Sequence, residues 1–65
     1  MMKVSYKYKD SCGNIVKCTH ESVANYSDEK SEYDPYILRI IRDKEGNVIA
    51  GPMIGQFFDF TESPD

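Results

Sequence analysis

The chain has 65 residues, a formal net charge of −3, 40% hydrophobic and 29% charged residues, and no tryptophan. A chain of this size buries only about 60% of the surface that its unfolded form exposes, which leaves room for one domain and little material for the supported cleft of an enzyme. The composition excludes a disordered or fibrous protein, and no run approaches the roughly 20 apolar residues of a membrane span.

The N-terminal segment 1–7 has charges where a secretory signal needs a continuous apolar stretch. We therefore expect a cytoplasmic protein, inside the host cell, that makes no contact with a membrane.

Two copies of one turn pattern organise the chain. Residues 10–14 read DSCGN, residues 43–47 read DKEGN, and two β-branched residues follow each copy. The aspartate can cap the turn, the middle residues suit a type I turn, and the glycine supplies the left-handed residue of a bulge that returns the chain. Each copy predicts a β-hairpin. The turn resembles the one in the tyrosine-aspartate repeats of large shell-forming toxins, over the D-x-x-G-N residues alone, and we infer no family from it.

The first hairpin predicts one apolar and one lysine-rich face. If the two ends of the turn pair, three cross-strand pairs share one face: Tyr8 with Val16, Tyr6 with Cys18, and Val4 with His20. The opposite face carries four candidate partner-binding residues, called the lysine face below: Lys3, Lys7, Lys9 and Lys17. Lys7 directly opposite Lys17 is a mildly destabilising like-charge pair. Either the lysines keep the sheet soluble and protect it from aggregation, or they bind an anionic partner.

The cysteines and the histidine form a C-x5-C-x-H pattern that does not match the common zinc sites. In the predicted register Cys12 lies in the turn and Cys18 lies about 13 Å away along the strand, too far for a disulfide or a shared metal ion. His20 has no nucleophile beside it on its own face. No glycine-rich phosphate loop or nucleophile elbow is present. We expect two free thiols, no metal, no cofactor and no catalysis.

The segment 21–34 is polar and acidic. Val23, Tyr26 and Tyr33 roughly fit one helical face, and Asp34 before Pro35 ends the segment, so we expect a short helix or a loop. Its acidic stretch, 28–34, is either a solvated face or a surface for a basic partner.

The second hairpin predicts a central strand over 36–42. Three pairs follow from its turn: Arg42 with Val48, Ile41 with Ile49, and Ile40 with Ala50. Apolar residues lie on both faces of this strand, as expected of a central strand that is covered by other parts of the protein on each face. Gly51-Pro52 predicts an edge or a bulge, because proline cannot donate to a ladder.

The segment 54–60 predicts a further short strand, followed by a flexible tail, 61–65. Neighbours on a strand face opposite sides, so we expect Phe58 and Phe60 in the core and Phe57 in a partner-binding surface. Residues 1–60 would form a single small domain.

The expected fold class is therefore α+β: two hairpins joined by a short helix or loop, in a small antiparallel sheet with a C-terminal strand. The expected function is a non-catalytic interaction domain that binds another protein, with the general character of inhibitors or adaptors from phages and mobile elements. The alternative is a single-stranded nucleic-acid binder that uses the lysine face, although that role needs exposed aromatic rings and Tyr6 and Tyr8 face the other way. A central strand with two apolar faces also predicts a homodimer, or a monomer completed by its target, with Phe57 or Ile37 near the centre.

Overall fold

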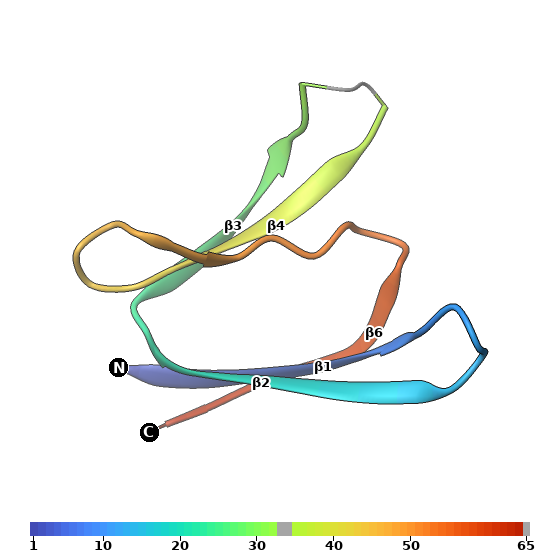
Figure 1. The fold of residues 1–65 in the computed structure, drawn as a ribbon. Helices are drawn as coiled ribbons and strands as arrows, with labels where there is room; N and C mark the ends of the chain where they lie inside the picture. The colour runs from blue at the N-terminus through green and yellow to red at the C-terminus, as the bar shows by residue number, and fades with distance from the viewer. Residues whose placement is uncertain (33–34, 65) are drawn as a thin grey trace.

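The computed structural model describes residues 1–32 and 35–64, which form two three-stranded antiparallel sheets (Figure 1). The strands are β1 (Met2–Lys9), β2 (Ile15–Val23), β3 (Asn25–Lys30), β4 (Ile37–Arg42), β5 (Val48–Ala50) and β6 (Phe57–Pro64). The strand orders are β2-β1-β6 and β3-β4-β5. None of the described residues is helical, so the expected α+β class is wrong and the domain is all-β.

The segment expected to be a helix or loop is mostly strand. β2 continues to Val23, and β3 pairs with β4 in an unbroken register from Asn25 opposite Arg42 to Lys30 opposite Ile37. Val23 and Tyr26 do contact the core, but they reach it from two strands and not from one helical face. Cross-strand partners in β4 outweigh a weak local helical pattern. Tyr33 and Asp34 lie outside the described residues.

The turn chemistry and the first register are confirmed. The Asp10 carboxylate accepts hydrogen bonds from the backbone N–H groups of Cys12 (2.9 Å) and Asn14 (2.8 Å), and Gly13 is left-handed with φ of 85°. The second turn repeats this arrangement around Asp43, with Gly46 at the same φ. Three predicted pairs are observed in the first hairpin: Tyr8 with Val16, Tyr6 with Cys18, and Val4 with His20.

The second hairpin follows its predicted register for one pair only. Arg42 lies opposite Val48 as expected, but the register then shifts and Ile41 lies opposite Ala50. The predicted pairs of Ile41 with Ile49 and of Ile40 with Ala50 are therefore wrong. The irregularity leaves Ile49 without a partner in β4, two residues before the Gly51-Pro52 segment in which we expected an edge or a bulge.

The C-terminal strand contains a bulge that redirects its phenylalanines. Lys7 lies opposite Phe58 and Ser5 opposite Thr61, so two residues of β6 face the single residue Tyr6. One of the two, Asp59, is left-handed with φ of 55°. Because of this extra residue, Phe57 and Phe60 both pack against the core and Phe58 is 43% exposed. The expectation that Phe58 is a core residue is wrong.

β6 also extends further than predicted. It continues to Pro64, which lies opposite Met2, so residues 61–64 pair with β1 where we expected a loose tail. The first and last strands thus run side by side, and β1 is the central strand of its sheet (Figure 1).

The core lies between the two sheets. Its buried side chains are Val4, Tyr6, Val23 and Ile41. The ring of Tyr26 in one sheet meets the edge of the Phe60 ring in the other at 4.9 Å between centroids, and the Tyr26 hydroxyl donates to Glu62 Oε2 at 2.9 Å. In the part of the chain that is described, no helix has the length and apolar character to cross a membrane.

Candidate functional site

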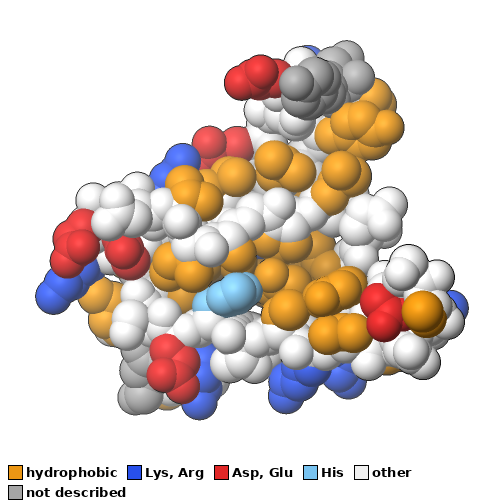
Figure 2. All heavy atoms as spheres, viewed as in Figure 1, with side chains coloured by type: hydrophobic (Ala, Val, Ile, Leu, Met, Phe, Trp, Pro, Cys, Tyr) orange, Lys and Arg blue, Asp and Glu red, His pale blue; other side chains and the backbone are white. Residues whose placement is uncertain are grey.

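The lysine face is the outer surface of the β2-β1-β6 sheet. Val4 and Tyr6 point into the core, so the alternate residues of β1 point outward. The register places Lys17 of β2 directly opposite Lys7 on this outer side. In Figure 2 several basic side chains lie along the lower margin of the molecule, beneath this sheet, and others lie at its left and upper edges. The structure thus brings Lys3, Lys7, Lys9 and Lys17 onto one face.

The hydrogen-bond alternation brings the two central lysines close together. The Asp10 N–H donates to the Asn14 carbonyl at 2.9 Å, so the ends of the turn form a hydrogen-bonded pair. Counting along an antiparallel ladder from there, Lys7 and Lys17 form a non-hydrogen-bonded pair, the type in which facing side chains approach most closely. Two ammonium groups in this arrangement favour an anion between them.

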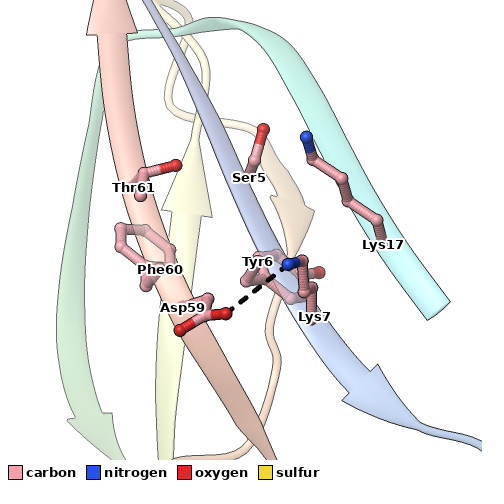
Figure 3. A pocket seen from close by; sticks show the side chains of 7 residues that line it. All are labelled: Ser5, Tyr6, Lys7, Lys17, Asp59, Phe60 and Thr61. Atoms are coloured by element: carbon pink, nitrogen blue, oxygen red, sulfur yellow. Dashed lines mark ion pairs between the residues drawn. The ribbon is translucent and has the colours of Figure 1, made fainter. Parts of the chain in front are cut away.

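The acidic side chain of Asp59 borders this surface. Asp59 Oδ2 lies 3.5 Å from Lys7 Nζ, and the two side chains are 63% and 41% exposed. Figure 3 shows this ion pair between β6 and β1, with Lys17 on the next strand. An open depression of about 450 Å³ is lined here by Ser5, Tyr6, Lys7, Lys17, Asp59, Phe60 and Thr61. Among the described residues, Lys3, Lys9 and Lys17 have no ion-pair partner.

Hydroxyl groups supplement the lysines. Ser5 Oγ lies 3.1 Å from Thr19 Oγ1 across the β1–β2 pair, and Thr61 lies opposite Ser5 on β6. Residues directly opposite one another share a face, so these hydroxyls accompany the lysines as further hydrogen-bond donors. The surface therefore suits carboxylate or phosphate groups.

Phe58 joins the lysine face, which sequence reasoning missed. It lies directly opposite Lys7 and is one of the exposed large hydrophobic side chains. Strict alternation from Phe60 had assigned it to the core. The sequence offers only a weak signal, because an aspartate at position 59 tolerates the left-handed conformation of a bulge better than most residues without requiring it.

Phe57 lies elsewhere. Its ring packs between the sheets, 5.3 Å from the Tyr6 centroid and 5.8 Å from that of Phe60. A second cavity of about 260 Å³ runs beside it, lined by Tyr6, Tyr8, Lys9, Pro52, Met53, Gln56 and Phe57. The structure does not bring Phe57 together with the lysine face.

Arg39 is half-buried and lies against aromatic rings, which the sequence did not predict. Its guanidinium carbon lies 4.7, 5.4 and 5.6 Å from the ring centroids of Phe60, Phe57 and Tyr26. Its Nε and one terminal nitrogen also donate to Asp28 at 2.7 and 3.0 Å. The hydrogen bonds from Arg39 hold the pKa of the Asp28 carboxyl below its ordinary value. The arginine thus connects the two sheets and has no free charge to offer a partner.

The acidic stretch is partly neutralised from within. Arg42 Nη1 donates to Glu29 Oε2 at 2.6 Å, and Ser27 Oγ donates to the same oxygen at 2.7 Å. These bonds, the one from Arg42 above all, lower the pKa of the Glu29 carboxyl. Since the first carboxylate of the stretch, Asp28, is also bound, the stretch offers less charge to a basic partner than its sequence suggests.

The two cysteines do not pair with each other. Cys12 is exposed in the turn, Cys18 is half-buried in β2, and both are free thiols. His20 Nε2 lies 3.0 Å from the Tyr6 hydroxyl, so this ring nitrogen has a hydrogen-bond partner within the protein. Within residues 1–32 and 35–64, no three histidine, cysteine, aspartate or glutamate side chains are grouped to hold a metal ion.

Comparisons with protein-family models, with curated proteins and with solved structures yield no match to this chain.

Proposed function

We propose that this domain is a non-catalytic binding module that attaches to an anionic surface of another protein through the lysine face. The observation that carries the proposal is a contrast of charge. The protein as a whole has a net charge of −3, and Arg39 and Arg42 pair internally with β3 carboxylates. Three lysines that have no ion-pair partner within residues 1–32 and 35–64 nevertheless gather on one outer sheet surface.

A cluster of charges such as the lysine face chiefly affects the rate at which two partners associate. Clustered charges on the rim or face of an interface accelerate association and exclude like-charged proteins, and both effects weaken with salt. A small module of this kind would block or adapt its target, as an inhibitor or adaptor does. Two free thiols fit a reducing compartment such as the cytoplasm.

The variant Lys17→Glu best separates an effect on binding from an effect on stability. Lys7 is already paired with Asp59, so a glutamate at position 7 would create a new repulsion there. At position 17 the glutamate lies opposite Lys7 and turns a repulsive pair into an attractive one. Stability should therefore hold or rise by a few tenths of a kcal/mol, as for other exposed cross-strand pairs. Binding to the proposed anionic partner should weaken.

The matched control is Lys44→Glu, which makes the same charge change in the second turn, away from the lysine face. We would measure binding of each protein to labelled polyglutamate across a salt titration, and capture of native partners on each immobilised protein. Lys17→Glu should lose both and Lys44→Glu neither. Equal binding by the two variants contradicts the proposal and leaves the lysines with solubility alone.

A second candidate function is supported by Phe58. An exposed ring beside lysines is the combination used to bind single-stranded nucleic acid, where stacking contributes about 1–3 kcal/mol per base. Phe58→Ser should then weaken binding to mixed-sequence oligonucleotides. Ile15→Ser is the control, because Ile15 is an exposed apolar residue of the same face without an aromatic ring. Oligonucleotide binding that is equal in both variants removes this candidate.

A further inference from the structure

The free edge of β2 extends the lysine face toward a partner. β2 is an outer strand of its sheet and has nine residues, and its pairing within the described residues is with β1 alone. The other outer strands are shorter or interrupted. β5 has three residues and a register shift, β6 contains the Asp59 bulge and ends at Pro64, and β3 has six residues. Proteins commonly protect edges by such means. β2 also bulges, at Ser22, but its residues from Ile15 to His20 pair in an unbroken register, and this stretch of edge carries Lys17.

The ladder alternation identifies which groups of β2 face outward. Tyr6 with Cys18 and Val4 with His20 are hydrogen-bonded pairs, because they lie an even number of steps from the bonded ends of the turn. The backbone N–H and carbonyl groups of Lys17 and Thr19 therefore point away from β1, along the open edge. The side chains of these same residues lie on the lysine face.

The other side of the edge is apolar. Cys18 lies between Lys17 and Thr19 and His20 follows them, and both side chains face inward and are half-buried. Figure 2 shows the one histidine of the chain within a band of hydrophobic side chains between the two sheets. A strand added to β2 would thus meet Lys17, between Ile15 and Thr19, with one set of its side chains, and the half-buried Cys18 and His20 with the other.

We propose that the edge of β2 binds an extended segment of an acidic protein as an added antiparallel strand, in which carboxylate and apolar side chains alternate. This inference rests on the proposed function and names the way its partner is held. A carboxylate side chain opposite Lys17 lies on the lysine face. The side chains before and after it in the added strand cover Cys18 and the hydrophobic band beside it. Backbone hydrogen bonds supply affinity, and the alternation supplies specificity.

A second copy of the chain fits this edge less well. Pairing centred on Lys17 places the two lysines against each other, and pairing centred on Cys18 sets Lys17 opposite Thr19, which provides no attractive charge pair. Pairing centred on Thr19 would set Lys17 opposite Glu21, but Ser22 is left-handed with φ of 57° and β2 bulges there against β1. The regular ladder that this last pairing needs is interrupted at its acidic end.

The test uses a labelled peptide of alternating glutamate and valine, as long as β2, and two N-methylated versions of it. In an antiparallel addition, the residues opposite Lys17 and Thr19 exchange backbone hydrogen bonds with them. N-methyl groups on the glutamate amides therefore block the backbone hydrogen bonds to β2, whereas N-methyl groups on the valine amides point away from β2. We expect the first to weaken binding by at least about tenfold and the second to leave it nearly unchanged. A native protein that does not bind the unmethylated peptide overturns the inference.

Two variants of Thr19 test whether the outward backbone N–H of β2 contributes to peptide binding. Thr19→Pro removes one outward N–H and keeps every lysine, at a position where an edge strand tolerates proline. Thr19→Val removes the hydroxyl contact with Ser5 and keeps the N–H. Thr19→Pro should bind the peptide about three- to tenfold more weakly than Thr19→Val, with denaturant melts confirming that both fold.

The outcomes separate this inference from the proposed function. Equal binding by the two methylated peptides, together with equal binding by the two Thr19 variants, overturns strand addition. If Lys17→Glu still abolishes polyglutamate binding in that case, the lysine face stands as the binding surface without the edge. Binding that is unaffected by Lys17→Glu as well overturns both. Should Thr19→Pro fail to fold, the methylated peptides decide alone.

Discussion

Arg39 illustrates how a single side chain can join two sheets that share a small core. A guanidinium is planar and always charged, so it can stack on rings while its edge binds a carboxylate. Arg39 does both, with Phe57 and Phe60 on the opposite sheet and Asp28 on the neighbouring strand. Since the described residues include only four buried hydrophobic side chains, we expect this contact to contribute to the cohesion of the two layers.

Arg39→Lys should destabilise the domain by about 1 kcal/mol, because an ammonium keeps the charge and loses the stacking and the two-pronged hydrogen bond. Arg42→Lys is the control. Arg42 also pairs with a β3 carboxylate, but no aromatic ring of the described residues lies against it. Denaturant melts should show a clear loss for Arg39→Lys and little change for Arg42→Lys. Equal losses would mean that the aromatic contacts contribute nothing.

At the scale of elements, β1 is bordered by a bulge on each side. Two residues of β2 face one of β1 near Ser22, and two residues of β6 face Tyr6 near Asp59. Both marker residues are left-handed without being glycine. Each bulge changes which face the following residues occupy, and so directs Val23 and Phe60 into the core.

The Asp59 bulge predicts opposite effects for two substitutions. Asp59→Gly relieves the left-handed strain and should raise stability by up to about 1 kcal/mol. Asp59→Ala retains the strain, loses the ion pair with Lys7 and should lower stability. Both remove the acidic group from the lysine face, so both should strengthen polyglutamate binding. Equal stability of the two variants in thermal melts would contradict the bulge as the source of the difference.

The pairing of β3 with β4 predicts that acid weakens the domain. Arginine hydrogen bonds lower the pKa of the Asp28 and Glu29 carboxyls in the folded state. Their contribution to stability is therefore complete above their ordinary pKa values, 3.8 and 4.5, and is lost as the pH falls below these toward the lowered values. Denaturant melts from about pH 6 to about pH 2 should follow this decline.

Asp28→Asn should be less stable than the native protein at neutral pH and should lose less stability on acidification. Glu45→Gln, a change in an exposed turn, serves as the control and should follow the native curve. A native curve that stays flat below pH 4.5 would contradict the role of these pairs.

At the scale of the whole molecule, the thin two-sheet architecture leaves apolar side chains uncovered. Tyr36, Ile37 and Ile54 are 49%, 44% and 38% exposed, and the Ile54 N–H donates to the Ile37 carbonyl at 2.8 Å, so these residues are neighbours. In Figure 1 the far end of the β3–β4 hairpin extends away from the other sheet, which explains why this end lacks cover.

This apolar end predicts self-association at micromolar concentration, through Ile37 as its centre. Ile37→Ser should shift sedimentation toward the monomer. Val48→Ser, at another exposed aliphatic residue in the same sheet, should not. A native protein that sediments as a monomer at these concentrations would contradict self-association, and the apolar end would then be left for a partner.

What the sequence determined by itself is the part of the fold that depends on neighbouring residues. Each D-x-x-G-N segment contains the capping carboxylate and the left-handed glycine of its own turn, and alternation with a period of two extends the register outward from it. The first hairpin, its lysine face and the separation of Cys12 from Cys18 follow from this. The first pair of the second hairpin follows as well, up to the irregularity at Ile49.

What only the tertiary structure decided depends on residues far apart in the chain. The acidic segment 25–30 became a strand because β4 supplies its backbone partners and two arginines for its carboxylates, and a local helical spacing could not compete with these. The bulges at Ser22 and Asp59 arise where a strand must meet both β1 and the opposite sheet, and neither residue type demands a left-handed backbone. That displacement by one residue moved Phe58 to the surface and Phe60 into the core, because on a strand a single extra residue exchanges the two faces.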